Sequence, residues 1–442
     1  MLQALVRFRD HNRQTPALLW AFVYFFCLLT GYYLLRPVRE AMGADSDVRA
    51  VFPAGLVDWF AGRGVSLGDF TLQFLFTCTF ILMVLLQPVY GALVSRYARR
   101  VFLPVVYGFF IACLLAFHFV FESALPGRGM AFFLWLTVFN LFAVAVFWSF
   151  MADVFSNADA KRVYGYIGAA GTLGAMLGPL LTRTLVEAIG IGQLLLVSAG
   201  FLIVCLLCIL RLRPWAVARE LEQNLASGEV PMGGGVLAGL RLVAREPLLR
   251  AIAILVFFGV GVGTLLYNEQ AAIARAYFTD AASRTAYYAG IDLAVNGLTL
   301  LVQLLLTRWL LTRHGIGPAL LIPAFAILIG FAALAASPFP LLVAAVQVVT
   351  RASEFSLAKP ARETVYTRVP REWRYKAGAA IDTVIYRGGD LTFVWLHKAL
   401  SVLGSGAVFL TGMAVTAGMA FGAWRLVREQ SKLPDERPAA GG

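Results

Sequence analysis

The stretch from residue 191 to residue 210 reads IGQLLLVSAGFLIVCLLCIL and contains no charged residue. As an α-helix, an apolar run of this length crosses a hydrocarbon core of about 30 Å. Similar runs recur along the whole chain of 442 residues, of which 60% are hydrophobic and only 14% are charged. Soluble domains carry charge on roughly a quarter of their residues. The sequence therefore predicts an all-α protein that spans a membrane many times.

The apolar runs predict about twelve transmembrane helices in two sets of six. We expect them near residues 17–40, 70–94, 101–121, 130–153, 164–187 and 191–210, and then near 248–270, 285–309, 317–336, 339–358, 376–398 and 402–425. Gly, Pro and charged residues separate the runs. The expected domains are an N-terminal half (1–210), a central cytoplasmic linker (211–247), a C-terminal half (248–425) and a cytoplasmic tail (426–442).

The distribution of Lys and Arg predicts the orientation of the helices. Basic residues gather in short cytoplasmic loops of membrane proteins. Here they are densest in alternate loops, above all between residues 359 and 376. This pattern places both termini in the cytoplasm of a multi-pass protein of the bacterial inner membrane. The net charge of +12 then faces anionic lipid, so we expect membrane lipid and no nucleic acid as a partner.

Several enzyme classes lack their signatures in this chain. It has no phosphate-binding Gly-x-x-x-x-Gly-Lys loop, no His-Glu-x-x-His helix and no Gly-x-Ser-x-Gly elbow. The five cysteines lie inside apolar runs, and the four histidines (His11, His118, His314 and His397) are scattered. We therefore expect no enzyme activity, no metal site and no cofactor, although an intramembrane enzyme remains a minor alternative.

A weak internal repeat relates the two halves. Residues 147–150 (FWSF) followed by 161–166 (KRVYGY) resemble residues 354–357 (EFSL) followed by 373–378 (WRYKAG). Halves repeated in this way resemble the major facilitator fold, in which the solute site lies between them near the middle of the membrane. Residues 91–100 (GALVSRYARR) are similar to a cytoplasmic loop of that superfamily, except that Ser95 stands where an acidic residue is usual.

Glycines line one face of the expected fifth helix. They are spaced three or four apart, so that two helix backbones can approach closely there. Both static packing and a rocking seam fit this stripe, which consists of Gly165, Gly168, Gly171, Gly174 and Gly178.

Ionisable residues inside the expected helices are the main functional candidates, because a charge in a membrane is costly. Arg351 with Glu354, and Arg387 with Asp390, are three residues apart and could simply pair on one helix face. The cations Arg36, Arg39 and Lys376 favour a solute with several negative charges, since Arg and Lys both bind phosphate. We add Arg387 and three aromatic residues as candidates for solute binding, although aromatic rings in membrane helices also serve packing: Tyr32, Tyr33 and Tyr386.

Four segments resemble the bacterial and plastid ATP/ADP translocase family of nucleotide exchangers, within the major facilitator superfamily. They are residues 32–40 (YYLLRPVRE), 147–153 (FWSFMAD), 266–269 (LYNE) and 375–390 (YKAGAAIDTVIYRGGD), of which the last is the most specific. The resemblance is strongest to the family's free-living bacterial branch. It implies roles in nucleotide transport for Arg39, Asp153, Glu269 and Lys376. Arg39 stands where the exchangers tend to have Lys, and Asp153 where they tend to have Glu.

The leading hypothesis is a secondary transporter that works by alternating access and exchanges a nucleotide or another phosphorylated or anionic metabolite. Asp153 and Glu269, with Asp292 and Asp382, would couple or gate transport by pairing with the cations when no solute is bound. One alternative is proton-coupled transport of an unrelated solute, with Asp153, Glu269 or Asp292 titrating. Another is a scaffold or sensor that does not transport, although no obligate protein partner is evident.

Overall fold

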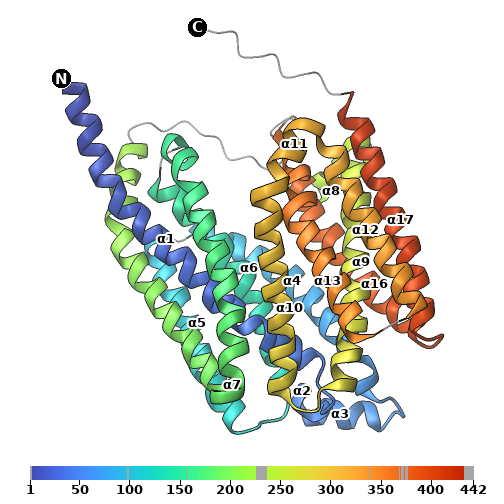
Figure 1. Ribbon diagram of the computed structural model, residues 1–442. Helices are drawn as coiled ribbons and strands as arrows, with labels where there is room; N and C mark the ends of the chain where they lie inside the picture. Colours follow the sequence, from blue (N-terminus) through green and yellow to red (C-terminus); the bar gives the residue numbers. More distant parts are fainter. Residues whose placement is uncertain are drawn as a thin grey trace. The chain divides into compact units, whose positions relative to one another are not determined.

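The computed structural model describes residues 2–96, 99–155, 157–224, 236–337 and 339–367, then 369, 373 and 377–432. This part of the chain is helical and contains no strand (Figure 1). Its first helices are α1 (Leu2–Gly43), α2 (Val48–Val51), α3 (Ala54–Ala61), α4 (Thr71–Arg96), α5 (Arg99–Glu122), α6 (Arg128–Val154) and α7 (Asn157–Asn224). They are followed by α8 (Val236–Arg245), α9 (Pro247–Tyr277), α10 (Ala281–Val302), α11 (Arg308–His314), α12 (Ile316–Ala336), α13 (Pro340–Ser353), α14 (Lys359–Thr367), α15 (Gly378–Ala380), α16 (Tyr386–Ser401) and α17 (Ser405–Gln430).

The number of spans agrees with the sequence. Within the described residues, ten helical stretches are long and apolar enough to cross a membrane. One of them, Tyr166–Ala218, has 53 residues and breaks at Gly190, whose φ of 78° and ψ of 169° suit only glycine. It therefore counts as two spans, and the helical tract from Gly378 to Ser401 adds another. The prediction of an all-α membrane protein with about twelve helices is confirmed.

The chain folds into two compact units that each draw on separate stretches of sequence. Unit 1 contains residues 1–71, 81–230 and 274–293, and unit 2 contains residues 72–80, 231–273 and 294–442. The start of α4 thus belongs to unit 2, while the end of α9 and the first part of α10 belong to unit 1. The segment 274–293 contributes Asp292 and Arg284 to two buried ionic groups of unit 1.

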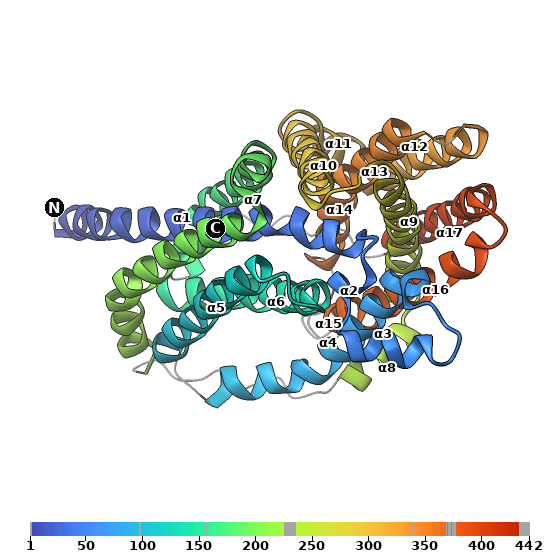
Figure 2. The same cartoon turned by 90° about the horizontal axis from the view of Figure 1, so that it is seen from below.

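The core of unit 1 is built around α1, which runs against α7 and also contacts α6 (Figure 2). Glycines of α7 make this approach possible. A Cβ atom at Gly178 would lie 2.8 Å from the backbone nitrogen of Leu34, and one at Gly174 would collide with the carbonyl oxygen of Phe26. The predicted glycine stripe therefore lies under α1, although Gly168 meets nothing within 4 Å.

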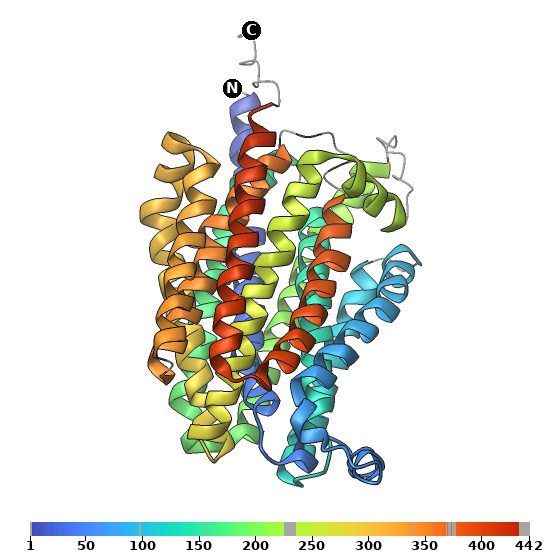
Figure 3. The same ribbon diagram turned by 90° about the vertical axis from the view of Figure 1, so that its right-hand side faces the viewer.

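The core of unit 2 packs α17 against α12, and Figure 3 shows α17 in red. Among the described residues, π-helical segments interrupt its helices at Gln303–Thr307, Glu354–Ala358 and Ile381–Ile385. The first two are joined, because Thr307 Oγ1 donates to the carbonyl oxygen of Ser356 at 2.8 Å and Gln303 Nε2 donates to that of Phe355 at 3.2 Å. Side chains thus bind the carbonyl groups that the wider π-turns leave exposed.

Candidate functional site

The last turns of α1 are held in place by hydrogen bonds from α7 to its backbone. Thr182 Oγ1 donates to the carbonyl oxygen of Leu34 at 2.7 Å, and Ser198 Oγ donates to that of Gly31 at 3.0 Å. Both hydroxyl groups are buried. Since a helix is rigid over a few turns, these bonds also fix the direction of Arg36 and Arg39.

Arg36 lies at the centre of a buried ionic cluster in unit 1. Its Nε is 3.2 Å from Glu40 Oε1, and its Nη1 is 3.5 Å from Asp292 Oδ1 on α10. Arg39 Nη2 contacts the same oxygen of Glu40 at 2.9 Å. The two arginine side chains are 16% and 17% exposed and the two carboxylates 4% and 2%. We call these four residues the Arg36 cluster.

The Arg36 cluster is electrically balanced, with two cations and two anions. Within it, the predicted solute-binding residue Arg36 contacts the predicted gating residue Asp292, and Arg39 contacts Glu40. A buried ion pair adds little to stability compared with apolar packing, but removing one partner is strongly destabilising. Ionic groups inside a membrane span are therefore candidates for function. The contact between Arg36 and Asp292 joins α1 to a residue more than 250 positions away, and no local pattern in the sequence predicts it.

A second buried pair lies in unit 1. Arg284 Nη2 contacts Asp45 Oδ1 at 2.9 Å, with side chains only 2% and 9% exposed. Arg284 Nη1 also donates to the carbonyl oxygens of Phe278 and Thr279. The pair joins the turn that follows α1 to the first turn of α10.

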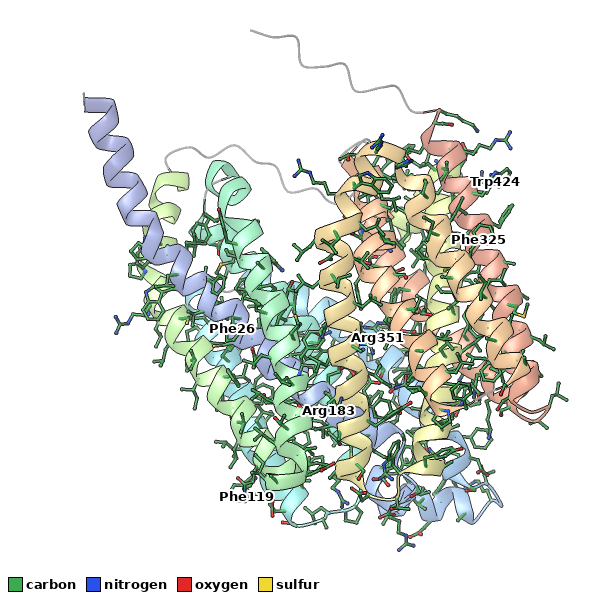
Figure 4. All side chains as sticks on the ribbon, viewed as in Figure 1. Phe26, Phe119, Arg183, Phe325, Arg351 and Trp424 are labelled. Atoms are coloured by element: carbon green, nitrogen blue, oxygen red, sulfur yellow. The ribbon has the colours of Figure 1, made fainter. Side chains whose placement is uncertain are left out.

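A further arginine, Arg183, extends from α7 toward the same segment of unit 1 (Figure 4). A Cβ atom at Gly290 of α10 would lie 3.0 Å from its Nη1. A larger residue at position 290 would thus crowd the guanidinium group.

The two predicted tyrosines of α1 have different surroundings. The ring of Tyr32 is buried in the core of unit 1, with its centroid 5.1 Å from that of Tyr33 and 6.5 Å from that of Phe139. The ring of Tyr33 is half-buried, and the guanidinium carbon of Arg36 lies 5.8 Å from its centre. The ring of Tyr33 therefore borders the ionic cluster.

In unit 2, a polar group joins α9 to α16. Thr264 Oγ1 donates to Asp390 Oδ1 at 3.0 Å, and Arg387 Nη1 contacts Asp390 Oδ2 at 3.3 Å. The pairing of Arg387 with Asp390 within one helix is thus confirmed. Arg387 remains 34% exposed, and its guanidinium carbon lies 5.5 Å from the ring centre of Tyr386, which is itself 41% exposed.

The remaining predicted residues are dispersed. Asp382 lies in a π-helical segment with its side chain 61% exposed, and its Oδ1 is 3.6 Å from Nη2 of the buried Arg362. Asp153 is half-buried in the last turn of α6. Lys376 lies outside the described residues.

Glu269, the last predicted gating residue, pairs with a residue that sequence reasoning set aside. His397 Nε2 on α16 lies 2.9 Å from Glu269 Oε1 on α9. The two side chains are 9% and 7% exposed. His397 was missed because the histidines are scattered in the sequence, and no local pattern connects positions 269 and 397. Among the described residues, no group of three His, Cys, Asp or Glu side chains could hold a metal ion.

Comparison with known proteins connects this arrangement to transport. The sequence from residue 22 to residue 392 matches the model of the Major Facilitator Superfamily. No curated protein matches the chain significantly. The structure is similar to that of the nucleoside transporter NupG, in a mutant form, with a TM-score of 0.63 and 13% identity over 93% of this chain and 99% of the other.

Two further solved structures are similar. An auto-inhibited POT family peptide transporter has a TM-score of 0.60 and 14% identity, covering 96% of this chain and 99% of its own. The human organic anion transporter MFSD10 (TETRAN) has a TM-score of 0.57 and 17% identity, covering 92% and 98%. At these identities the likeness shows a shared fold, while the family match extends over most of the sequence. The chain therefore belongs to the major facilitator superfamily and is a multi-pass secondary transporter.

Proposed function

We propose that this transporter carries a small organic anion with phosphate groups, with a nucleotide as the first candidate, by alternating access. The observation that supports the proposal is the position of Arg36. It lies inside an apolar span, where its guanidinium group contacts carboxylates on two helices at 3.2 and 3.5 Å. Charged residues inside membrane spans are rare, and they are candidates for function by default.

The carboxylates of the Arg36 cluster occupy the place that a solute phosphate would take. A guanidinium group offers parallel N–H donors, and phosphate oxygens fit this geometry as well as carboxylate oxygens do. An incoming phosphate would displace Asp292 or Glu40 from Arg36.

The nucleotide assignment rests on the resemblance to the ATP/ADP translocase family. Arg39, Asp153, Glu269 and Lys376 stand at the positions that carry it. The half-buried ring of Tyr33 next to Arg36 offers a face for a base or a sugar. In unit 2, the exposed ring of Tyr386 next to Arg387 offers another. Asp382 would gate the unit 2 residues by pairing with Arg362, which it already approaches.

This site also gives a reason for exchange rather than one-way leakage. In the empty carrier, Arg36 stays paired with Asp292, which links α1 to α10. A solute that competes for Arg36 weakens this link and favours the state in which the link is broken. The carrier then changes state readily only when loaded, so that an anion bound on one side is exchanged for one on the other.

The cellular setting is part of the proposal. The positive-inside pattern supports cytoplasmic termini and a bacterial inner membrane, with basic loops that would face anionic lipid. Residues 211–247 would connect two six-helix halves. The solute would then be a cytoplasmic metabolite or one taken up from outside.

Thermal unfolding of the detergent-purified protein tests the solute class. ATP, ADP and inorganic phosphate are compared with uncharged adenosine. A ligand present at about 100 times its Kd stabilises the folded state by roughly 2.7 kcal/mol. We expect ATP or ADP to raise the Tm and adenosine to leave it unchanged. If adenosine raised the Tm as much as ADP does, the cations would have no role in recognising the solute.

The variant Arg36→Lys assigns the effect to the cluster. It keeps the positive charge but loses the planar fork. Losing one charge-assisted hydrogen bond, at roughly 1.5–3 kcal/mol, corresponds to a tenfold to hundredfold weaker affinity for ADP. Arg49→Lys is the matched control, because Arg49 pairs with Asp58 at 3.0 Å at the surface, with side chains 64% and 62% exposed. Equal affinity losses in both variants would contradict a site at Arg36.

A further inference from the structure

Arg183 of α7 begins at the same level of unit 1 as Arg36 of α1. It directly follows Thr182, whose Oγ1 donates to the carbonyl oxygen of Leu34 at 2.7 Å. Leu34 is two residues before Arg36, which corresponds to about 3 Å along a helix. The hydrogen bond that fixes the end of α1 therefore also sets the height at which Arg183 leaves α7.

The helix α10 meets both arginines at this level. Nη1 of Arg183 lies 3.0 Å from the position of a Cβ atom at Gly290 (Figure 4). Nη1 of Arg36 lies 3.5 Å from Oδ1 of Asp292, which is two residues further along α10. Guanidinium groups from two different helices thus approach neighbouring positions of a third.

Gly290 leaves the room that the guanidinium group of Arg183 occupies. It is the third of three small residues spaced four apart on α10, after Ala282 and Ala286. The two alanines are partly buried against the core of unit 1. Small residues at this spacing let membrane helices approach closely. At Gly290 the neighbour is a charged group instead of an apolar side chain.

Arg183 differs from other arginines of this region in its lack of an anionic partner. Arg36 contacts two carboxylates at 3.2 and 3.5 Å, and Arg284 contacts Asp45 at 2.9 Å. Within the described part of the chain, no ion pair or hydrogen bond involves Arg183, although Glu187 stands four residues further along the same helix. Its side chain is exposed.

The position of Arg183 inside a membrane span makes this charge unusual. It belongs to the apolar stretch Tyr166–Ala218, seven residues or about 10 Å before the break at Gly190. Its guanidinium group lies beside Gly290, nine residues or about 13 Å after the beginning of α10 at Ala281, and does not turn toward the helix end. Ionised side chains at such positions face the interior of the bundle or water and mark solute pathways.

We propose that Arg183 is a further solute-binding residue, which holds a second anionic group of the solute while Arg36 holds the first. The inference deepens the proposed function and rests on it. Two linked phosphate groups present oxygens to both guanidinium groups, whereas a monophosphate satisfies only one of them. None of the motifs found in the sequence contains Arg183, and only its place beside Gly290 assigns it this role.

The affinities for ADP and AMP test the second contact. They are measured by isothermal titration calorimetry of the protein in phosphatidylcholine nanodiscs. We expect Arg183→Gln to bind ADP about tenfold to hundredfold more weakly, which is the loss of one charge-assisted hydrogen bond, and to bind AMP as the wild type does. The unchanged affinity for AMP also shows that the variant is folded. Equal effects on ADP and AMP, including no effect on either, would overturn the proposal.

A second variant tests the role of Gly290. Gly290→Ala adds a Cβ atom 3.0 Å from Nη1 of Arg183 and so displaces the guanidinium group. It should weaken ADP binding in the wild type and have no further effect in Arg183→Gln. Two changes that act on one contact are not additive. Additive losses would mean that Gly290→Ala acts on helix packing alone and would contradict the contact.

Arg213→Gln is the matched control. Arg213 is an exposed arginine of the same helix, beyond the break at Gly190, so this variant loses the same charge elsewhere. Its affinities for ADP and AMP should equal those of the wild type. A loss of ADP affinity as large as that of Arg183→Gln would show that only the net charge matters and would refute a specific contact.

A lipid headgroup carries the same phosphate chemistry as the solute. The titrations are therefore repeated in phosphatidylglycerol nanodiscs, where we expect the same difference between the wild type and Arg183→Gln. If this lipid abolishes the difference, the headgroup occupies Arg183 and the assignment to the solute is wrong. If the wild type binds neither ADP nor AMP, the proposed function fails and this inference with it, whereas equal affinities of the wild type for ADP and AMP contradict the inference alone.

Discussion

The two units bury ionic groups of different chemistry. In unit 1, the Arg36 cluster joins two guanidinium groups to two carboxylates through contacts of 2.9–3.5 Å. In unit 2, one carboxylate, Glu269, faces one imidazole, His397, at 2.9 Å. Arginine keeps its proton under all physiological conditions, whereas imidazole gains or loses one near neutral pH. The guanidinium groups of unit 1 therefore keep a fixed positive charge, whereas the imidazole of unit 2 carries charge only when it is protonated.

This difference bears on what a carrier of anions has to do. Under the proposed function, recognition of the solute needs fixed positive charge, which Arg36 and Arg39 would supply. The pair of Glu269 and His397 carries no such fixed charge.

The largest effect is expected from unbalancing the Arg36 cluster. Asp292→Leu leaves two arginines with one carboxylate and should cost about 3–5 kcal/mol of unfolding free energy, because a buried charge loses its partner. Removing Arg36 at the same time, in Arg36→Leu/Asp292→Leu, leaves the balanced pair of Arg39 and Glu40. The double variant should therefore be more stable than the single one, as measured by unfolding in a denaturing detergent.

Transport should fail in both of these variants, for different reasons. The single variant loses stability and solute, while the double variant keeps its fold and loses the solute-binding cation. If the double variant were as unstable as the sum of the two single changes, the two residues would act independently. The cluster would then not differ from isolated surface charges.

The sequence predicted the fold well, because apolar runs and breaks between them are local signals. It also divided the run from Tyr166 to Ala218 between residues 187 and 191, and the structure breaks there at Gly190. It also found Arg36, Arg39, Glu269 and Asp292, since a charge inside an apolar run stands out without any knowledge of the structure.

The partners of these residues could not be predicted. Asp292 meets Arg36, and His397 meets Glu269, only because distant helices pack together. Neither pair has a spacing typical of neighbours on one helix, as the pair of Arg387 and Asp390 has. A single histidine in a helix carries no signal by itself, and the sequence therefore left the most unusual residue of unit 2 without a role.

A medium effect is expected where glycines let helices approach in the two units. At Gly178, a Cβ atom would lie 2.8 Å from the backbone of Leu34 and of Thr30, which cannot move without shifting α1. At Gly261, it would meet the ring of Phe393, which can turn aside. Overpacking typically costs about 1–3 kcal/mol, and we expect Gly178→Ala near the upper end and Gly261→Ala near the lower.

Thermal unfolding of Gly178→Ala and Gly261→Ala shows which of the two loses more stability, with Gly168→Ala as the control. Gly168 lies on the same helix as Gly178 but has nothing within 4 Å of the added atom, so its replacement should cost nothing or stabilise slightly. Because α1 carries Arg36, Gly178→Ala should also weaken ADP binding. A greater loss of stability in Gly261→Ala would mean that unit 2 is the more tightly constrained of the two.

The smallest effect is expected at a carboxylate of unit 1 that lies at the surface. Asp280 caps α10, because its Oδ1 accepts a hydrogen bond from the backbone N–H of Ser283 at 2.7 Å. These hydrogen bonds lower the pKa of Asp280 below its ordinary value of 3.8. A lowered pKa in the folded state means that the ionised cap stabilises the protein above this ordinary value and that the contribution fades as the pH falls through the folded pKa. Asp280→Ala should therefore cost about 1 kcal/mol at pH 7 and less below about pH 4. If Asp280→Ala lowered the unfolding free energy as much as Asp292→Leu does, burial would not be the reason for the large effect expected at the Arg36 cluster.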